Sequence, residues 1–110
     1  MKLAQALPDL VLDMESALAH LGRGDLAEQL RELTLERWTY DDFSDTAYLY
    51  LAWPPNLKLP RRRAVDAPQG DRLSLYDEVG ANLDIDEQGR LAGIEVLEGK
   101  RIATRLANQD

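Results

Sequence analysis

The sequence has no cysteine and a single histidine, and these shortages exclude several kinds of site. Without cysteine there is no disulfide framework, no thiolate metal site and no cysteine nucleophile. His20 has no second histidine with which to share a zinc ion, so we interpret it as a structural residue near the end of a helix. We therefore expect no cofactor and no bound metal.

Long apolar runs are also missing. No stretch approaches the length of a membrane span, and polar residues and Pro8 interrupt the apolar start of the chain in a way that does not suit a signal peptide. We expect a cytoplasmic protein of bacterial type that has no membrane partner.

Positive charge is scarce, because 13 Lys and Arg stand against 20 Asp and Glu and give a net charge of −7. This balance argues against an extended nucleic-acid surface. The exception is residues 54–72, a long, proline-rich and basic connection with five basic and two acidic side chains. This connection either binds an anion or is a solvated loop whose positive charge offsets the acidic remainder of the chain. The cationic residues concerned are Lys58, Arg61, Arg62 and Arg63.

The 110 residues suit a single domain, residues 1–110, that begins with helices. Leucine and methionine recur at steps of three and four, which predicts a helix from about Pro8 to Leu21. Asp25 is placed to cap a second helix. The short linker around Gly22 predicts that residues 1–34 form a helical hairpin, an extension in front of a β-rich core over residues 35–98.

After the helices the apolar period changes to that of strands. Residues 35–40 and 46–53 predict a β-hairpin, and residues 72–76, 79–85 and 91–97 have strand character, with a last short helix beyond them. The fold class is therefore α+β, with the helical hairpin packed on one face of an antiparallel sheet of about four strands.

Five of the chain's seven aromatic residues lie in the two strands predicted for the first hairpin. Tyr48 and Tyr50 alternate with leucines, so both faces of the hairpin are substantially apolar. The ordinary explanation is core packing. The alternative is a protein interface, where tyrosine and tryptophan carry much of the binding energy, and its candidate residues are Trp38, Tyr48, Tyr50 and Trp53.

Residues 84–95, DIDEQGRLAGIE, nearly match a calcium-binding loop, with Asp84, Asp86 and Glu95 at ligand positions. The flanks have strand period, whereas such a loop lies between helices. Along an extended strand Glu95 would lie roughly 17 Å beyond the turn, too far to return to Asp84. We therefore expect a strand, a turn shaped by Asp86 and Gly89, and a second strand.

The sequence also resembles a known family. Tyr40-Asp41, Asp45 and Ala47 through Leu51 are similar to the opening of the YuzE-like domain of unknown function, and Val79 through Asp86 followed by Gly89 through Leu97 is similar to its ending. The resemblance covers about residues 38–98. It implies a small bacterial family without an established activity or known catalytic residues, some members of which are suspected to accompany toxin-like partners.

No nucleophile and base pair and no phosphate loop emerges, so we expect no enzyme. The leading hypothesis is a small protein-interaction module or homodimer. One alternative is an antitoxin-like binder of a basic toxin, which would suit the acidic surface. Another is a small ligand- or ion-binding domain, or a minor enzyme, that uses Asp84 or Glu95; for Glu95, pairing with an arginine is the competing interpretation.

Overall fold

A computed structural model describes residues 1–53 and 71–109 of the chain. Lys58, Arg61, Arg62 and Arg63 therefore lie outside the described residues, and so does the choice between an anion contact and a solvated loop.

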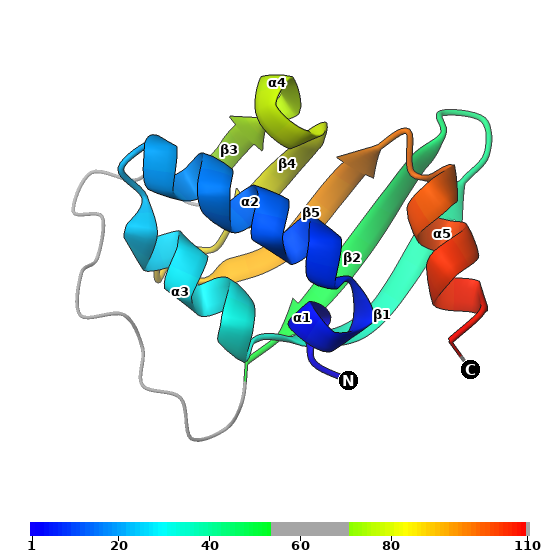
Figure 1. The fold of residues 1–110 in the computed structure, drawn as a ribbon, viewed down its shortest axis with the longest axis horizontal. Helices are drawn as coiled ribbons and strands as arrows, with labels where there is room; N and C mark the ends of the chain where they lie inside the picture. The colour runs from blue at the N-terminus through cyan, green and yellow to red at the C-terminus, as the bar shows by residue number, and fades with distance from the viewer. Residues whose placement is uncertain (54–70, 110) are drawn as a thin grey trace.

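The described strands form one antiparallel sheet in the order β1-β2-β5-β4-β3 (Figure 1). Their bounds are β1 Thr34–Asp41, β2 Thr46–Ala52, β3 Asp71–Leu75, β4 Ala81–Ile85 and β5 Leu91–Leu97. The sheet has five strands rather than about four, because Asp71–Leu75 pair along their whole length with β4, while Tyr76, expected to end this strand, begins α4.

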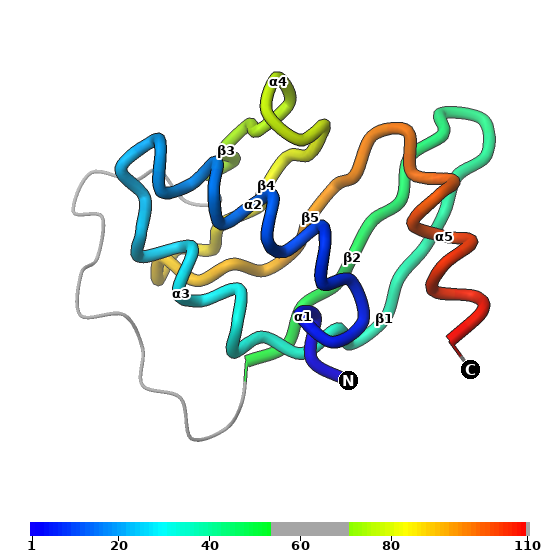
Figure 2. The backbone as a smooth tube through the Cα atoms, viewed as in Figure 1, coloured from blue at the N-terminus to red at the C-terminus, as the bar shows by residue number. Residues whose placement is uncertain are grey.

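The helices gather on one side of this sheet, and the chain runs through α2 and α3 across the same face (Figure 2). Their bounds are α1 Leu3–Ala6, α2 Pro8–His20, α3 Gly24–Glu32, α4 Tyr76–Val79 and α5 Lys100–Ala107. The fold is thus α+β, as the change of period predicted. None of these helices is both long and apolar enough to cross a membrane.

Two local expectations at element ends are corrected. Asp25 does not cap α3: the cap position is Arg23, and Asp25 lies in the first turn, where its carboxylate pairs with the Arg23 guanidinium. Val79 is not a strand residue, because it ends α4. Gly80 then takes the left-handed conformation, with φ +68°, that lets the chain turn into β4.

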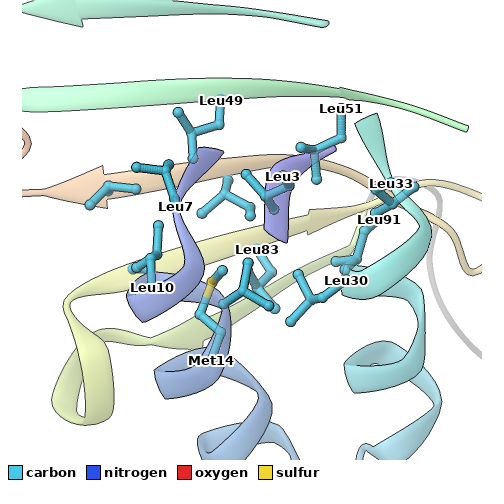
Figure 3. Packing of buried hydrophobic residues seen from close by; sticks show 14 of the residues in the cluster. Leu3, Leu7, Leu10, Met14, Leu30, Leu33, Leu49, Leu51, Leu83 and Leu91 are labelled. Atoms are coloured by element: carbon cyan, nitrogen blue, oxygen red, sulfur yellow. The ribbon is translucent and has the colours of Figure 1, made fainter. Parts of the chain in front are cut away.

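The core fills the space between the helix layer and the sheet. Leucines at the predicted helical spacing, together with Met14, point from α1, α2 and α3 onto the inward residues of the strands (Figure 3). In β2 the inward residues Ala47, Leu49 and Leu51 are buried and the intervening ones are only half-buried. This alternation means that the helices cover one face of the sheet, and no described element covers the other.

Candidate interaction surface

The sheet face turned away from the helices carries two rows of side chains across all five strands. The registers place Arg37, Tyr50, Gly93, Asp84 and Arg72 in one row. The adjacent row consists of Thr39, Tyr48, Glu95, Asn82 and Ser74. We call these ten residues the open face.

Tyr48 links the two rows. Its ring lies over Gly93, and its hydroxyl donates a hydrogen bond to Oδ2 of Asp84. Gly93 makes the room, because a Cβ at this position would lie 2.7 Å from both Cε1 and Cζ of Tyr48. The absence of one side chain in the middle of β5 therefore lets an aromatic ring on β2 reach a carboxylate on β4.

Arg72 joins two carboxylates at the other end of the open face. Its Nε and Nη2 donate to Asp84 at 2.9 and 3.2 Å, and its Nη1 donates to Oε1 of Glu95 at 3.1 Å. Asn82 Nδ2 donates to the same Glu95 oxygen at 3.0 Å. The hydrogen bonds to Asp84, and the negative charges of both acids, raise the pKa of Arg72 above its ordinary value.

Aromatic contacts continue the row toward β1. The rings of Tyr48 and Tyr50 have centroids 4.7 Å apart, and the Arg37 guanidinium lies 3.9 Å from the centre of the Tyr50 ring. This is a cation–π contact at close range. Within residues 1–53 and 71–109, Arg37 forms no ion pair. One connected set of contacts thus runs from β1 to β3.

The Tyr48 hydroxyl is held as a hydrogen-bond donor. Partial burial raises the pKa of Tyr48, and its hydrogen bond to the negatively charged Asp84 raises it further. A phenol whose ionisation is made harder is poorly suited to act as a base or nucleophile. The arrangement orders polar groups and does not activate one.

The four aromatic candidates do not share one surface. Tyr48 and Tyr50 lie on the open face, whereas Trp38 and Trp53 are half-buried and pack against the core on the helix side. The Trp53 indole N–H donates to the Leu91 carbonyl oxygen at 3.2 Å. An interface on the uncovered face would therefore use the tyrosines without the tryptophans.

Of the charged residues of the open face, the sequence pointed to the acids Asp84 and Glu95 but not to the two arginines. Arg37 and Arg72 looked like ordinary strand residues, and Gly93 like part of a family motif. The alternation in each strand could have placed them outward. Which ones meet depends on the strand order, and a sequence pattern does not contain it.

The stretch that resembles a calcium loop forms the β4–β5 hairpin. The Asp86 carboxylate accepts the backbone N–H groups of Gln88 and Arg90 at 2.9 and 3.0 Å, and it pairs with the Arg90 guanidinium at 2.9 Å. Gly89 has φ +80°, a conformation that favours glycine. The turn is built by the two residues that the sequence indicated.

The distance argument against calcium was nevertheless wrong. Glu95 does lie near Asp84, because β5 pairs back along β4 with Gly93 opposite Asp84, so that both acids bond Arg72. The residue that argues against a calcium site is Asp86. Its carboxylate already accepts the Gln88 N–H of the turn and pairs with Arg90. Over the described chain, no group of three or more acids and histidines could hold a metal ion.

Two hollows in the surface are candidate ligand sites. Volumes of 280 and 230 Å³ lie on the helix side, one against α4 and α5 and the other between α2 and α5, with Arg101 lining both. Neither is lined by Asp84 or Glu95. A ligand bound in either hollow would therefore not contact Asp84 or Glu95.

Two polar residues away from the open face fix how the elements meet. Gln29, buried in α3, receives the Leu91 N–H at 2.9 Å and donates to the Gly89 carbonyl at 3.1 Å, which ties the helix to the β4–β5 turn. Asp45 accepts the Tyr40 hydroxyl at 2.7 Å and the Lys100 N–H at 3.1 Å, which ties the first hairpin to the start of α5.

The geometry defines a two-layer α+β protein in which no described element covers the sheet face turned away from the helices, and that face carries a connected set of side-chain contacts. Comparison with protein families places residues 37–99 in the family described as protein of unknown function, DUF2283. Because the match covers more than half of the chain, the protein belongs to this family. Among curated proteins and among solved structures, no match was found.

Proposed function

We propose that the protein is a non-enzymatic interaction module that binds another protein chain with its open face. The observation that carries this proposal is the linked row of tyrosine and arginine side chains on a sheet face that no described element covers. Tyrosine and arginine are among the residues that dominate the binding energy of protein interfaces.

Order in the free protein supports this role. Arg72 is held by two carboxylates, Tyr48 by Asp84, and Arg37 by stacking on Tyr50. Long side chains normally lose rotamer freedom when a partner binds, and side chains that are already ordered lose less. A preorganised face of this kind favours a protein partner that recognises charged groups and aromatic rings at fixed positions.

The chemistry of the face argues against a catalytic role and against nucleic acid. Arg72 pairs with both acids, and burial and Asp84 raise the pKa of Tyr48, so the contacts of the face do not mark any of these groups as an activated base. The two arginines of the face are balanced by Asp84 and Glu95, which gives no excess of positive charge for a phosphate backbone.

A ligand- or ion-binding role for Asp84 and Glu95 is a weaker candidate. The Arg72 guanidinium bonds both carboxylates, so it occupies the position between them that a bound cation would need. A metal cation would have to displace the Arg72 guanidinium from its hydrogen bonds to both carboxylates.

A toxin-like basic partner is favoured by one observation, the charge of the remaining surface. The chain carries 13 Lys and Arg against 20 Asp and Glu, a net charge of −7. Such a field would attract a basic protein from a distance. The open face itself is neutral, so this partner would contact other surfaces.

The finer family assignment is also a proposal. The similarity of Tyr40 through Leu51 and of Gly89 through Leu97 to the YuzE-like domain supports that name for the matched region. The same resemblance, with the absence of cysteine, supports a bacterial and cytoplasmic origin.

The test is a pull-down from an extract of the native cells, with the captured proteins identified by mass spectrometry. Wild-type protein is compared with Tyr50→Ala on the open face and with Leu12→Ala, which changes a 54% exposed leucine on α2. We expect wild type and Leu12→Ala to capture the same protein chains, the protein's own copies included, and Tyr50→Ala to lose them.

Folding of each variant is checked by circular dichroism. Equal capture by all three proteins would show that binding uses another surface. If the wild type captures no protein and does not self-associate, the interaction role itself is wrong.

A further inference from the structure

We propose that the open face binds a second copy of this chain, in a two-fold dimer in which Arg37 of each copy pairs with Glu95 of the other. This inference rests on the proposed function and names its partner. It is carried by the charge balance of the face and by two charged groups that the described chain leaves incompletely paired.

The charge balance favours self-association through this face. The chain has a net charge of −7, so two copies repel each other over most of their surfaces. The open face has two arginines, Arg37 and Arg72, and two acids, Asp84 and Glu95. A surface that meets its own copy must be self-complementary, and equal numbers of both charges allow this.

Arg37 is a cation without a carboxylate. Its guanidinium stacks on the Tyr50 ring at 3.9 Å, and it has no ion pair within residues 1–53 and 71–109. Stacking covers one face of the guanidinium, and the N–H groups at its edge stay able to donate in the plane. Arg37 can therefore take a carboxylate without leaving Tyr50.

Glu95 is a carboxylate with a spare oxygen. Arg72 and Asn82 both donate to Oε1, and in the described part of the chain no hydrogen bond reaches Oε2. A carboxylate offers acceptor sites on both oxygens. Glu95 can therefore accept a further guanidinium and keep both bonds within its own chain.

Arg37 and Glu95 do not meet within one copy. Arg37 lies on β1 and Glu95 on β5, with β2 between them, and they belong to different rows of the open face. At a strand spacing of about 4.8 Å the two backbones are roughly 10 Å apart across the sheet alone. Tyr48 and Tyr50, on β2, stand between them.

Because Arg37 and Glu95 are separated within one copy, a two-fold axis between two copies can form two ion pairs. When Arg37 of one copy meets Glu95 of the partner subunit, the same axis brings Glu95 of the first copy to the partner's Arg37. The two ion pairs then flank the tyrosines of both copies, which lie at the centre of the contact. Central aromatic groups surrounded by polar pairs are the usual arrangement of a binding hot spot.

The test exchanges the two charges. In Arg37→Glu, both contacts of a dimer would bring two glutamates together; in Glu95→Arg, both would bring two arginines together. We expect wild type to sediment as a dimer in analytical ultracentrifugation. Each variant alone should sediment as a monomer, with self-association weakened at least tenfold. A one-to-one mixture should form a heterodimer, because every contact is again between an arginine and a glutamate.

Glu95→Arg also removes the acceptor for Arg72 and Asn82, so folding is checked by circular dichroism and a milder pair of variants is included. Glu95→Gln keeps a side-chain oxygen for those donors and removes the charge, and Arg37→Gln removes the other charge. Both should weaken the dimer without unfolding the chain.

Several outcomes would overturn the inference. They are a monomeric wild type, a dimer that survives all four substitutions, or a well-folded mixture of the charge-exchanged variants that stays monomeric. A monomeric wild type that still captures another protein in a Tyr50-dependent way would overturn the dimer and leave the interaction role intact.

Discussion

Gly93 shows how much one residue can decide about the open face. It is buried in the centre of β5, where its backbone is that of an ordinary strand, so its importance is the space it leaves and not an unusual φ. The Tyr48 ring fills that space and thereby reaches Asp84. The contact between the Tyr48 ring on β2 and the Asp84 carboxylate on β4 thus depends on the lack of a single methyl group on β5.

Replacing Gly93 by alanine should displace the Tyr48 ring and break its hydrogen bond to Asp84. We expect the free energy of unfolding to fall by about 1–3 kcal/mol, the usual cost of overpacking, measured by urea denaturation. The raised pKa of Tyr48 should also move back toward its ordinary value, because burial and Asp84 cause the shift, and ultraviolet titration would detect this.

The matched control is Gly24→Ala. Gly24 is the first residue of α3, and a Cβ there would meet no atom within 4 Å. This change should leave stability equal or raise it by about 0.4–1 kcal/mol, because alanine lowers the entropy of the unfolded chain. Equal effects of the two substitutions would contradict a steric role for Gly93.

At the scale of the elements, Gln29 determines how α3 meets the sheet. Its side chain bonds the backbone on both sides of Arg90, through the Gly89 carbonyl and the Leu91 N–H. Only 7% of the residue is exposed, and it is the one buried polar residue in the described chain. The position reads as an ordinary helix glutamine in the sequence, because its partners lie about sixty residues away.

Truncation of Gln29 to alanine should leave a buried N–H and a carbonyl without partners. We expect a loss of about 1–3 kcal/mol in the free energy of unfolding, measured by urea denaturation, and faster hydrogen exchange at the Leu91 amide. Glu28→Ala, one residue earlier on the exposed side of the same helix, should change stability by less than about 0.5 kcal/mol. A similar loss in both variants would contradict a specific tie.

At the scale of the whole molecule, the tyrosines set an alkaline limit to stability. The hydrogen bond to Asp45, with partial burial and nearby carboxylates, raises the pKa of Tyr40 to about 12, and burial and Asp84 raise that of Tyr48. In the unfolded chain both phenols titrate near their ordinary value of about 10. The native state therefore keeps its phenolic protons at a pH where the unfolded state has lost them.

The stability from these shifts is fully present below about pH 10 and is lost as the pH rises toward about 12. We expect the urea midpoint to fall over this range, and to fall less steeply in Tyr40→Phe. Tyr76→Phe, which alters a 61% exposed ring on α4, is the control and should follow wild type. The same slope in Tyr40→Phe as in wild type would contradict the assignment to Tyr40.

Most of the fold could be predicted from local patterns. The leucine spacing placed α2 and α3, the change to period two placed the first hairpin, and Asp86 with Gly89 marked the last turn. Two predictions were wrong, the N-terminal cap of α3 and the number of strands. Asp25 could serve as a cap or as a first-turn residue, and the pairing of β3 depends on a strand that the local pattern does not identify. Local preferences alone do not resolve either choice.

The candidate surface was only half predicted. Tyr48 and Tyr50 were singled out, but they were grouped with Trp38 and Trp53, which the fold turns to the opposite side. Asp84 and Glu95 occupy ligand positions of one calcium-like motif, but the strand period of its flanks predicted that they lie far apart. Arg37 and Arg72 have no sequence signal of their own, and Gly93 reads as part of a family motif, since each becomes significant only beside residues from other strands.

The sequence by itself determined the elements, the acidic character and the absence of cysteine chemistry, because these follow from short-range periodicity and composition. Only the tertiary structure decided which face the helices cover and which side chains meet on the other face. The strand order β1-β2-β5-β4-β3 brings β2 beside β5, more than forty residues later in the chain. The free energy that selects this order comes from burying the helix layer against one face as a whole, so no single segment specifies it.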